Sequence, residues 1–185
     1  MITLYWSLIH PYLNYGILAW GQASKSLLNK ILLLQKRVLR FIFFANQRES
    51  AIPLFIKSNI PPLNIIYCQS VASLVHDVVK ENCPKNLLRL FTSIKDIHSY
   101  NTRSAVTNKL YTQSSRLKTQ LNSFSRTGTR FWNSIPNSFR ICTKPVFKKK
   151  MRNTLFSMLQ SEGSYFEIEK AIQLFPDYCK LVEST

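Results

Sequence analysis

The acids, histidines and glycines of this chain are not spaced for catalysis. None of Asp77, Asp96 and Asp177 is adjacent in the sequence to another acid, whereas two-metal nucleotidyl transfer needs carboxylates that hold the metal ions together. The glycines form no phosphate-binding loop, the histidines have no metal-ligand spacing, and no Ser-His-Asp signature is present. We therefore expect this chain alone to catalyse no reaction and to hold no metal or other cofactor.

The four cysteines predict a reducing environment. Cys68, Cys83, Cys142 and Cys179 match neither a zinc knuckle nor a redox pair. No secretory signal is present. Free thiols in a nuclear or cytoplasmic protein are the simplest interpretation, and secretion is not expected.

Lysine and arginine dominate the charge of the 185-residue chain, which is +16 with a pI of about 10.0. Residues 1–48 hold six basic residues and no acid, and residues 97–161 hold twelve and no acid. Such blocks favour a polyanionic partner, with nucleic acid first and an anionic membrane surface second. A solvated basic surface without a specific ligand is the plain alternative.

The candidate nucleic-acid-binding residues come from these two blocks. Arginine can bind phosphate oxygens through two parallel hydrogen bonds, and lysine adds positive charge. Tyr100 and Trp132 could stack on bases, although the position of Trp132 beside Phe131 and Ile135 favours the core. His98 could bind phosphate or fix its loop. The full set is Lys30, Lys36, Arg37, Arg40, His98, Tyr100, Arg103, Arg130, Lys148, Lys149, Lys150 and Arg152.

Apolar spacing predicts that helices carry most of these residues. Helices are expected over residues 24–46, 64–80 and 144–160, with short ones after Pro84 and over 124–132, the last interrupted by Gly128. The fold class is therefore mainly α, with a short irregular or β-containing insertion near residues 97–123. In the first helix we expect an inward stripe, off which the basic residues mostly lie: Leu27, Ile31, Leu34, Val38 and Phe41, widened by Leu28, Leu32, Leu39 and Ile42.

Residues 1–24 contain no charged side chain. Polar residues, glycine and Pro11 interrupt the apolar run, and Pro11 should end or kink a helix. This pattern favours buried core over a membrane span. A chain that starts on a core segment also suggests a piece of a larger protein. We expect the following side chains to be buried: Leu4, Trp6, Leu8, Leu13 and Trp20.

Five short blocks follow one another along nearly the whole chain. They are Leu-Ile-His-Pro-Tyr-Leu-Asn-Tyr-Gly at 8–16 with Trp-Gly at 20–21; Leu-Gln-Lys-Arg-Val-Leu-Arg at 34–40; His-Ser-Tyr-Asn-Thr-Arg at 98–103; Ser-Phe at 123–124 with Gly128 and Phe-Trp-Asn-Ser-Ile-Pro at 131–136; and Phe-Lys-Lys-Lys-Met at 147–151. Their types and order resemble the C-terminal region of LINE-type, jockey-like non-LTR retrotransposon reverse transcriptases. Met151 departs from that family's usual leucine.

The resemblance implies a helical thumb-like region over residues 1–96, a basic post-thumb region over 97–161 and an acidic tail over 162–185 that matches no block. The family's catalytic palm, with its magnesium-binding Asp-Asp turn, would precede residue 1 and would be a partner of this chain. The implied ligands are RNA, RNA–DNA hybrid and DNA duplex.

From residues and resemblance together, we expect a non-catalytic fragment of an RNA-directed DNA polymerase. It would grip template RNA or primer–template duplex during target-primed reverse transcription. The rival interpretation is a protein–protein scaffold or a domesticated retroelement remnant. Salt separates the two, because a phosphate grip weakens steeply with salt and an apolar interface does not. No membrane contact is expected.

Overall fold

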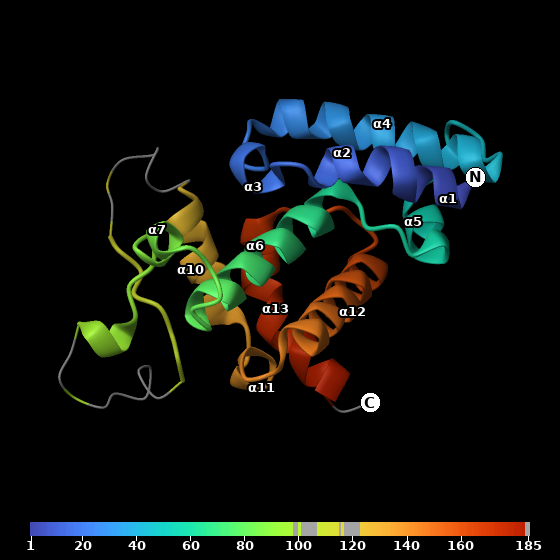
Figure 1. Ribbon diagram of the computed structural model, residues 1–185. Helices are drawn as coiled ribbons and strands as arrows, with labels where there is room; N and C mark the ends of the chain where they lie inside the picture. Colours follow the sequence, from blue (N-terminus) through green and yellow to red (C-terminus); the bar gives the residue numbers. More distant parts are fainter. Residues whose placement is uncertain (98–99, 101–106, 115, 117–122, 184–185) are drawn as a thin grey trace.

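Helices form most of the chain, which confirms the mainly α prediction (Figure 1). The computed structural model describes residues 1–97, 100, 107–114, 116 and 123–183. Within these ranges, the one β pairing is an isolated antiparallel bridge between Ser93 and Leu110. The helical elements are α1 Ile2–Leu4, a π-helical turn Tyr5–Ile9, α2 His10–Asn14, α3 Ile17–Trp20, α4 Lys25–Phe43, α5 Ile52–Ser58, α6 Leu63–Val79, α7 Lys85–Leu88, a 3₁₀ turn Ile94–Asp96, α10 Phe124–Ser134, α11 Asn137–Arg140, α12 Lys144–Glu162 and α13 Ile168–Glu183.

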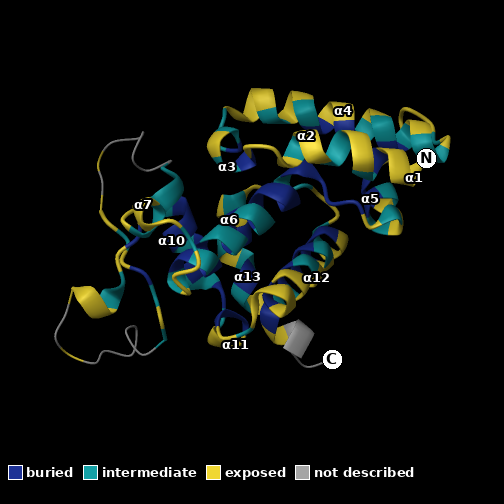
Figure 2. Cartoon of the chain, viewed as in Figure 1, coloured by how far each residue is buried: buried dark blue, intermediate teal, exposed yellow. Residues whose placement is uncertain are grey.

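The central element is α6, which contacts α2, α3, α4, α10, α12 and α13. In Figure 1, α4 and the N-terminal helices lie on one side of it, and α10, α12 and α13 lie on the other. Figure 2 shows α6 as largely buried. A helix that is apolar on nearly every side belongs inside a protein. Its buried apolar residues are Leu63, Ile65, Ile66, Tyr67, Cys68, Val71, Ala72, Val75 and Val78.

The segment expected as an acidic tail forms α13, which packs against α10, α12 and α6. Ala171, Phe175 and Cys179 from this helix are fully buried. Glu169 and Asp177 of this helix are exposed, and Glu169 pairs with Arg130 at 2.8 Å. Helices from all three predicted segments therefore share one core.

The helix α10 runs without a break through Gly128. A Cβ at that position would lie 3.1 Å from Cγ2 of Val75. A side chain at position 128 would therefore press on Val75 where α10 crosses α6 closely, and the expected interruption of the helix at Gly128 is wrong.

The N-terminal segment is helical from residue 2 to 14, and a π turn lies directly before Pro11. The wider turn, closed by a hydrogen bond from the amide of His10 to the carbonyl of Tyr5, accommodates the missing amide hydrogen of proline. The expected burial is wrong for Leu4 and Leu8, each 59% exposed, because nothing in the described chain covers them. The other three expected core residues, Trp6, Leu13 and Trp20, are half-buried.

No helix in the described ranges combines the length and the hydropathy that a membrane span requires.

The orientation of α4 differs from the prediction. Its Gln35 is buried and donates to the Tyr5 hydroxyl at 2.7 Å and to the Pro61 carbonyl at 2.9 Å, while its side-chain oxygen accepts from the Leu63 amide at 2.9 Å. These bonds turn the stripe of Leu32, Gln35 and Leu39 inward. Leu32 and Leu39 were predicted to face inward and are buried as expected. Three other residues of the predicted inward stripe are exposed instead, and we call them the outer face of α4: Leu27, Leu34 and Phe41.

Gly21 lies where the chain passes over Tyr67. A Cβ there would lie 2.4 Å from Cδ2 of Tyr67 and 2.5 Å from the Ile17 carbonyl oxygen. We expect Gly21→Ala to lower the free energy of unfolding by about 1–3 kcal/mol, since the backbone must shift. Ser26→Ala, at an exposed site nearby, should change it by less than about 0.5 kcal/mol. Equal denaturation midpoints for the two variants would contradict this packing.

Candidate nucleic-acid interface

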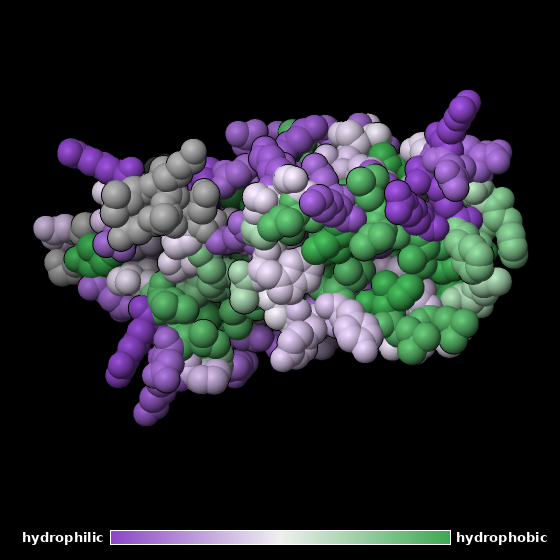
Figure 3. Space-filling view, turned by 90° about the horizontal axis from the view of Figure 1, so that it is seen from above, coloured by the Kyte–Doolittle hydropathy of each residue, from purple (hydrophilic) through white to green (hydrophobic). Residues whose placement is uncertain are grey.

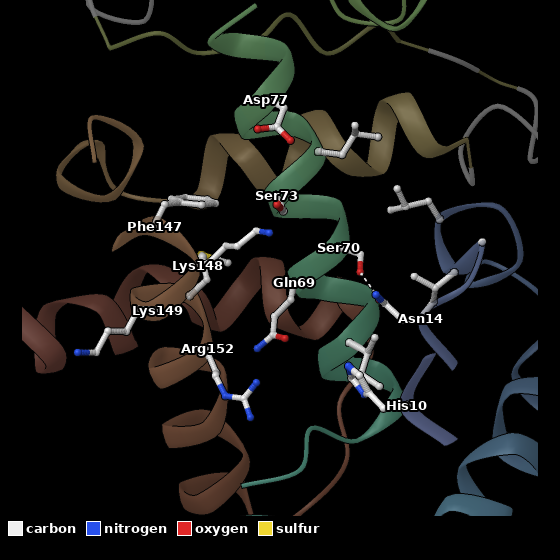
Figure 4. A pocket seen from close by; sticks show the side chains of 16 residues that line it. His10, Asn14, Gln69, Ser70, Ser73, Asp77, Phe147, Lys148, Lys149 and Arg152 are labelled. Atoms are coloured by element: carbon white, nitrogen blue, oxygen red, sulfur yellow. Dashed lines mark hydrogen bonds between the residues drawn. The ribbon is translucent and has the colours of Figure 1, made fainter. Parts of the chain in front are cut away.

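Two stripes of polar side chains face each other across α6 and α12. Each has a spacing of four residues, which places its members on one side of a helix. Lys144 Nζ lies 2.6 Å from Asp77 Oδ2 and sets an antiparallel register between the helices. This register brings Lys148 opposite Ser73 (Figure 4). The stripes are Gln69, Ser73 and Asp77 on α6, and Lys144, Lys148 and Arg152 on α12.

A cavity of about 640 Å³ lies between these stripes and the N-terminal helices. We call it the α6–α12 cavity. His10 and Asn14 of α2 supply polar groups on its third wall, and Ser70 Oγ lies 3.5 Å from Asn14 Oδ1. Apolar side chains complete the lining: Ile17, Leu18, Ile66, Leu74, Phe147 and Met151.

Lys148 is a cation of this cavity that has no partner in the described chain. It is exposed and makes no ion pair or hydrogen bond with any residue that the structure describes. In Figure 4 its side chain reaches across toward α6, whereas Lys149 points to the other side of α12. Lys148 can therefore meet an anion at the cavity without giving up an internal partner.

Arg152 lies at the same cavity but also stabilises the fold. Its guanidinium donates to the carbonyl oxygen of Asn59 and, at 3.2 Å, to Asn59 Oδ1. It lies 5.8 Å from the Trp6 ring centroid and 5.3 Å from that of Phe156. These contacts tie α12 to the end of α5 and to the N-terminal helices, so a change at Arg152 tests stability as well as binding.

The electrostatics of the cavity keep His10 neutral. Burial, and then the nearby positive charge of Arg152, lower the pKa of His10 below its usual value. At neutral pH its ring therefore offers one donor and one acceptor nitrogen rather than a second positive charge.

Three polar atoms at the cavity are buried and have no hydrogen-bond partner in the described chain: His10 Nδ1, Gln69 Nε2 and Asp77 Oδ1. Buried polar groups are almost always paired in proteins. All three belong to residues that line the cavity, so a polar ligand that entered it would lie beside groups whose hydrogen-bonding capacity is unused.

The basic residues of α4 divide into two kinds. Lys30 and Arg37 are exposed. Lys36 Nζ lies 4.0 Å from the centroid of the Tyr165 ring, and Arg40 donates to the Glu49 carbonyl at 2.7 Å. Only Lys30 and Arg37 are therefore available on α4 without losing a contact, and neither lines the α6–α12 cavity.

The remaining predicted residues are scattered. Arg130 is paired with Glu169, and Lys150 Nζ lies 5.1 Å from the Phe139 ring centroid. Tyr100 is 74% exposed. Two further candidates lie outside the described residues: His98 and Arg103. Lys148 and Arg152 thus lie together at the α6–α12 cavity, Lys149 lies beside them on α12 but points away from α6, and the other predicted residues lie on separate surfaces.

Trp132 is a core residue. It is 1% exposed, and its Nε1 donates to the Asn108 carbonyl at 3.0 Å. The neighbouring Asn133 bonds to both the amide and the carbonyl of Leu110, at 3.0 and 2.8 Å. Trp132 is therefore a structural residue rather than one that stacks on bases. Together with Asn133, it holds residues 108–110 against α10.

Sequence reasoning missed the polar half of the cavity. The helix was expected over residues 64–80, but Gln69, Ser73 and Asp77 were not recognised as a polar stripe along it, and His10 was considered only as part of the block at residues 8–16. Their signal was the four-residue spacing of polar side chains within an otherwise buried helix.

Comparisons with models of known protein families, with curated protein sequences and with solved structures found no match.

Proposed function

We propose that this chain binds nucleic acid at the α6–α12 cavity, without catalysing a reaction. The observation that carries the proposal is Lys148, an exposed cation without a partner in the described chain, at a cavity that polar side chains also line. A lysine ammonium is a good contact for a backbone phosphate. The net charge of +16 adds long-range attraction for a polyanion.

The wider role that we propose is that of a C-terminal fragment of a retrotransposon RNA-directed DNA polymerase. Support comes from the five sequence blocks. The first of them, residues 8–16, contributes His10 and Asn14 to the cavity, and the last, residues 147–151, contributes Lys148. Two blocks far apart in the sequence thus meet at one site. Template RNA or primer–template duplex would be the ligand, and the palm of the parent protein would supply magnesium-dependent chemistry.

A protein–protein scaffold is the second candidate function. The outer face of α4 favours it, because Leu27, Leu34 and Phe41 are 53%, 58% and 69% exposed. In Figure 3, which looks down on α4 and the N-terminal helices, hydrophobic side chains gather over the right half of the view. Exposed apolar patches of this kind often mark interfaces.

The deciding experiment is a salt series. Fluorescence anisotropy on a single-stranded RNA should give a log K that falls linearly with log salt, with a slope of about 0.7 per phosphate contact. We expect Lys148→Gln to flatten that slope by about 0.7. Lys85→Gln, which removes an exposed charge on α7, is the matched control and should leave the slope almost unchanged.

A second pair of variants tests whether the exposed cations of α4 contact phosphate in addition to Lys148. The pair Lys30→Gln and Arg37→Gln should flatten the slope by about 1.4 only if α4 also touches phosphate. An unchanged slope in the Lys148 variant, together with salt-independent binding of the wild type, would overturn the proposed function and favour the scaffold.

Lack of polymerase activity is a separate prediction. No group of three or more potential metal ligands occurs among the residues that the structure describes. We expect the purified chain to extend no primer on an RNA template with Mg²⁺ or Mn²⁺. Incorporation of labelled nucleotides above a buffer control, proportional to protein concentration, would show that this expectation is wrong.

A further inference from the structure

The α6–α12 cavity carries more polar chemistry than a grip on phosphate needs. A phosphate contact is satisfied by Lys148 at the cavity's edge. Gln69 projects from α6 and His10 from α2 (Figure 4). Both present a buried nitrogen without a partner in the part of the chain that the structure describes. Neutral donors and acceptors of this kind match the edge of a nucleobase better than they match a phosphate.

The size of the cavity decides which form of nucleic acid can enter. A volume of about 640 Å³ falls in the range of about 300–1,000 Å³ that is usual for small-molecule sites. It can take one nucleotide, whereas a duplex can only lie across its mouth. Bases within a duplex keep their pairing edges occupied, and RNA-binding proteins accordingly read bases that are unpaired and unstacked.

We infer that the α6–α12 cavity binds a single unpaired nucleotide, with its base between Gln69 and His10 and its phosphate at Lys148. The Gln69 amide nitrogen donates to an acceptor on the base edge, and the His10 ring supplies a second hydrogen bond. Leu74 and Met151, which line the cavity, pack against the base. The inference rests on the proposed function and adds a preference for single strands over duplex.

The test replaces Gln69 with a residue of similar shape and no hydrogen bonds. Gln69→Met should weaken binding of a single-stranded RNA about three- to tenfold, which is the usual effect of one neutral hydrogen bond. The salt slope should not change, because no charge is removed. Gln160→Met, at an exposed position on α12, is the matched control and should bind like the wild type.

Two further measurements distinguish recognition of the base from recognition of the phosphate. Adenosine and uridine monophosphates should displace a labelled RNA at lower concentration than inorganic phosphate does. The same RNA with abasic positions should bind wild type more weakly, and the difference between the abasic and the intact strand should be smaller for Gln69→Met than for wild type, because one of the base contacts is already missing. Thermal unfolding of each variant checks that the fold is retained.

The outcomes distinguish this inference from the proposed function. If Lys148→Gln flattens the salt slope, but Gln69→Met and the abasic strand bind as well as their controls, the cavity grips phosphate alone and the inference is wrong. The inference is also wrong if duplex binds as tightly as single strand. If the wild type binds no RNA at all, both the inference and the proposed function fail.

Discussion

Phe175→Ala is expected to lower the free energy of unfolding by about 3–5 kcal/mol, the usual loss when a buried phenylalanine is truncated. The ring is fully buried. It meets Phe131 edge to face at a centroid distance of 5.6 Å and Phe139 at 6.1 Å. A loss of this size is a large share of the total stability of about 5–15 kcal/mol that domains have. Chemical denaturation followed by circular dichroism would measure it.

The matched control is Phe44→Ala, because Phe44 is 83% exposed. It should change the free energy of unfolding by less than about 0.5 kcal/mol. If Phe175→Ala does not fold, Phe175→Leu should fold with a smaller loss, since it fills most of the space. Equal stabilities for Phe175→Ala and Phe44→Ala would mean that residues 162–185 are a solvated tail rather than part of the core.

Apolar spacing predicts the long helices α4, α6 and α12 but does not predict α13. The ranges of α4, α6 and α12 were predicted from apolar spacing, because each has a long apolar pattern. The helix α13 escaped prediction because its acids and the internal Pro176 obscure the pattern. The helix is part of the core because it packs against three other helices, and the local sequence does not reveal these contacts.

The face of α4 that turns inward could not be decided from its own sequence. Apolar residues occur around most of this helix, so spacing alone allowed two stripes. The choice depends on Gln35, whose partners at Tyr5, Pro61 and Leu63 lie about 26 to 30 residues away. A polar residue would ordinarily be placed outside. Its burial is understandable only once those hydrogen-bond partners are known.

The same limit applies to the basic residues. The sequence predicted the positive charge and its two blocks. It could not distinguish a cation that is exposed to a ligand from one that is hydrogen-bonded inside the fold. Arg140 is 5% exposed and donates to the carbonyls of Ile135 and Thr107, both at 2.7 Å. Lys148, eight residues later, has no such partner in the described chain. Only the three-dimensional arrangement separates structural arginines from a cation that can bind a ligand.

The outer face of α4 gives the second large expected effect. Replacing Leu27, Leu34 and Phe41 together with glutamine should reduce the fluorescence of an apolar-surface dye several-fold and should reduce self-association. Glutamine is a good helix former, so α4 should persist. Since all three side chains are more than half exposed, each substitution should cost less than about 0.5 kcal/mol of stability. Dye titration and analytical ultracentrifugation measure the two results.

The control keeps the apolar face and removes its basic neighbours. Lys30→Gln with Arg37→Gln should leave dye fluorescence at the wild-type level, because the apolar side chains are unchanged. If the chain is the C-terminal part of a polymerase, the outer face of α4 is a surface that another domain can cover, and covering it should protect it from the dye. If the triple variant instead binds as much dye as the wild type, the apolar surface lies elsewhere. The N-terminal helices with Leu4 and Leu8 would then be the next surface to change.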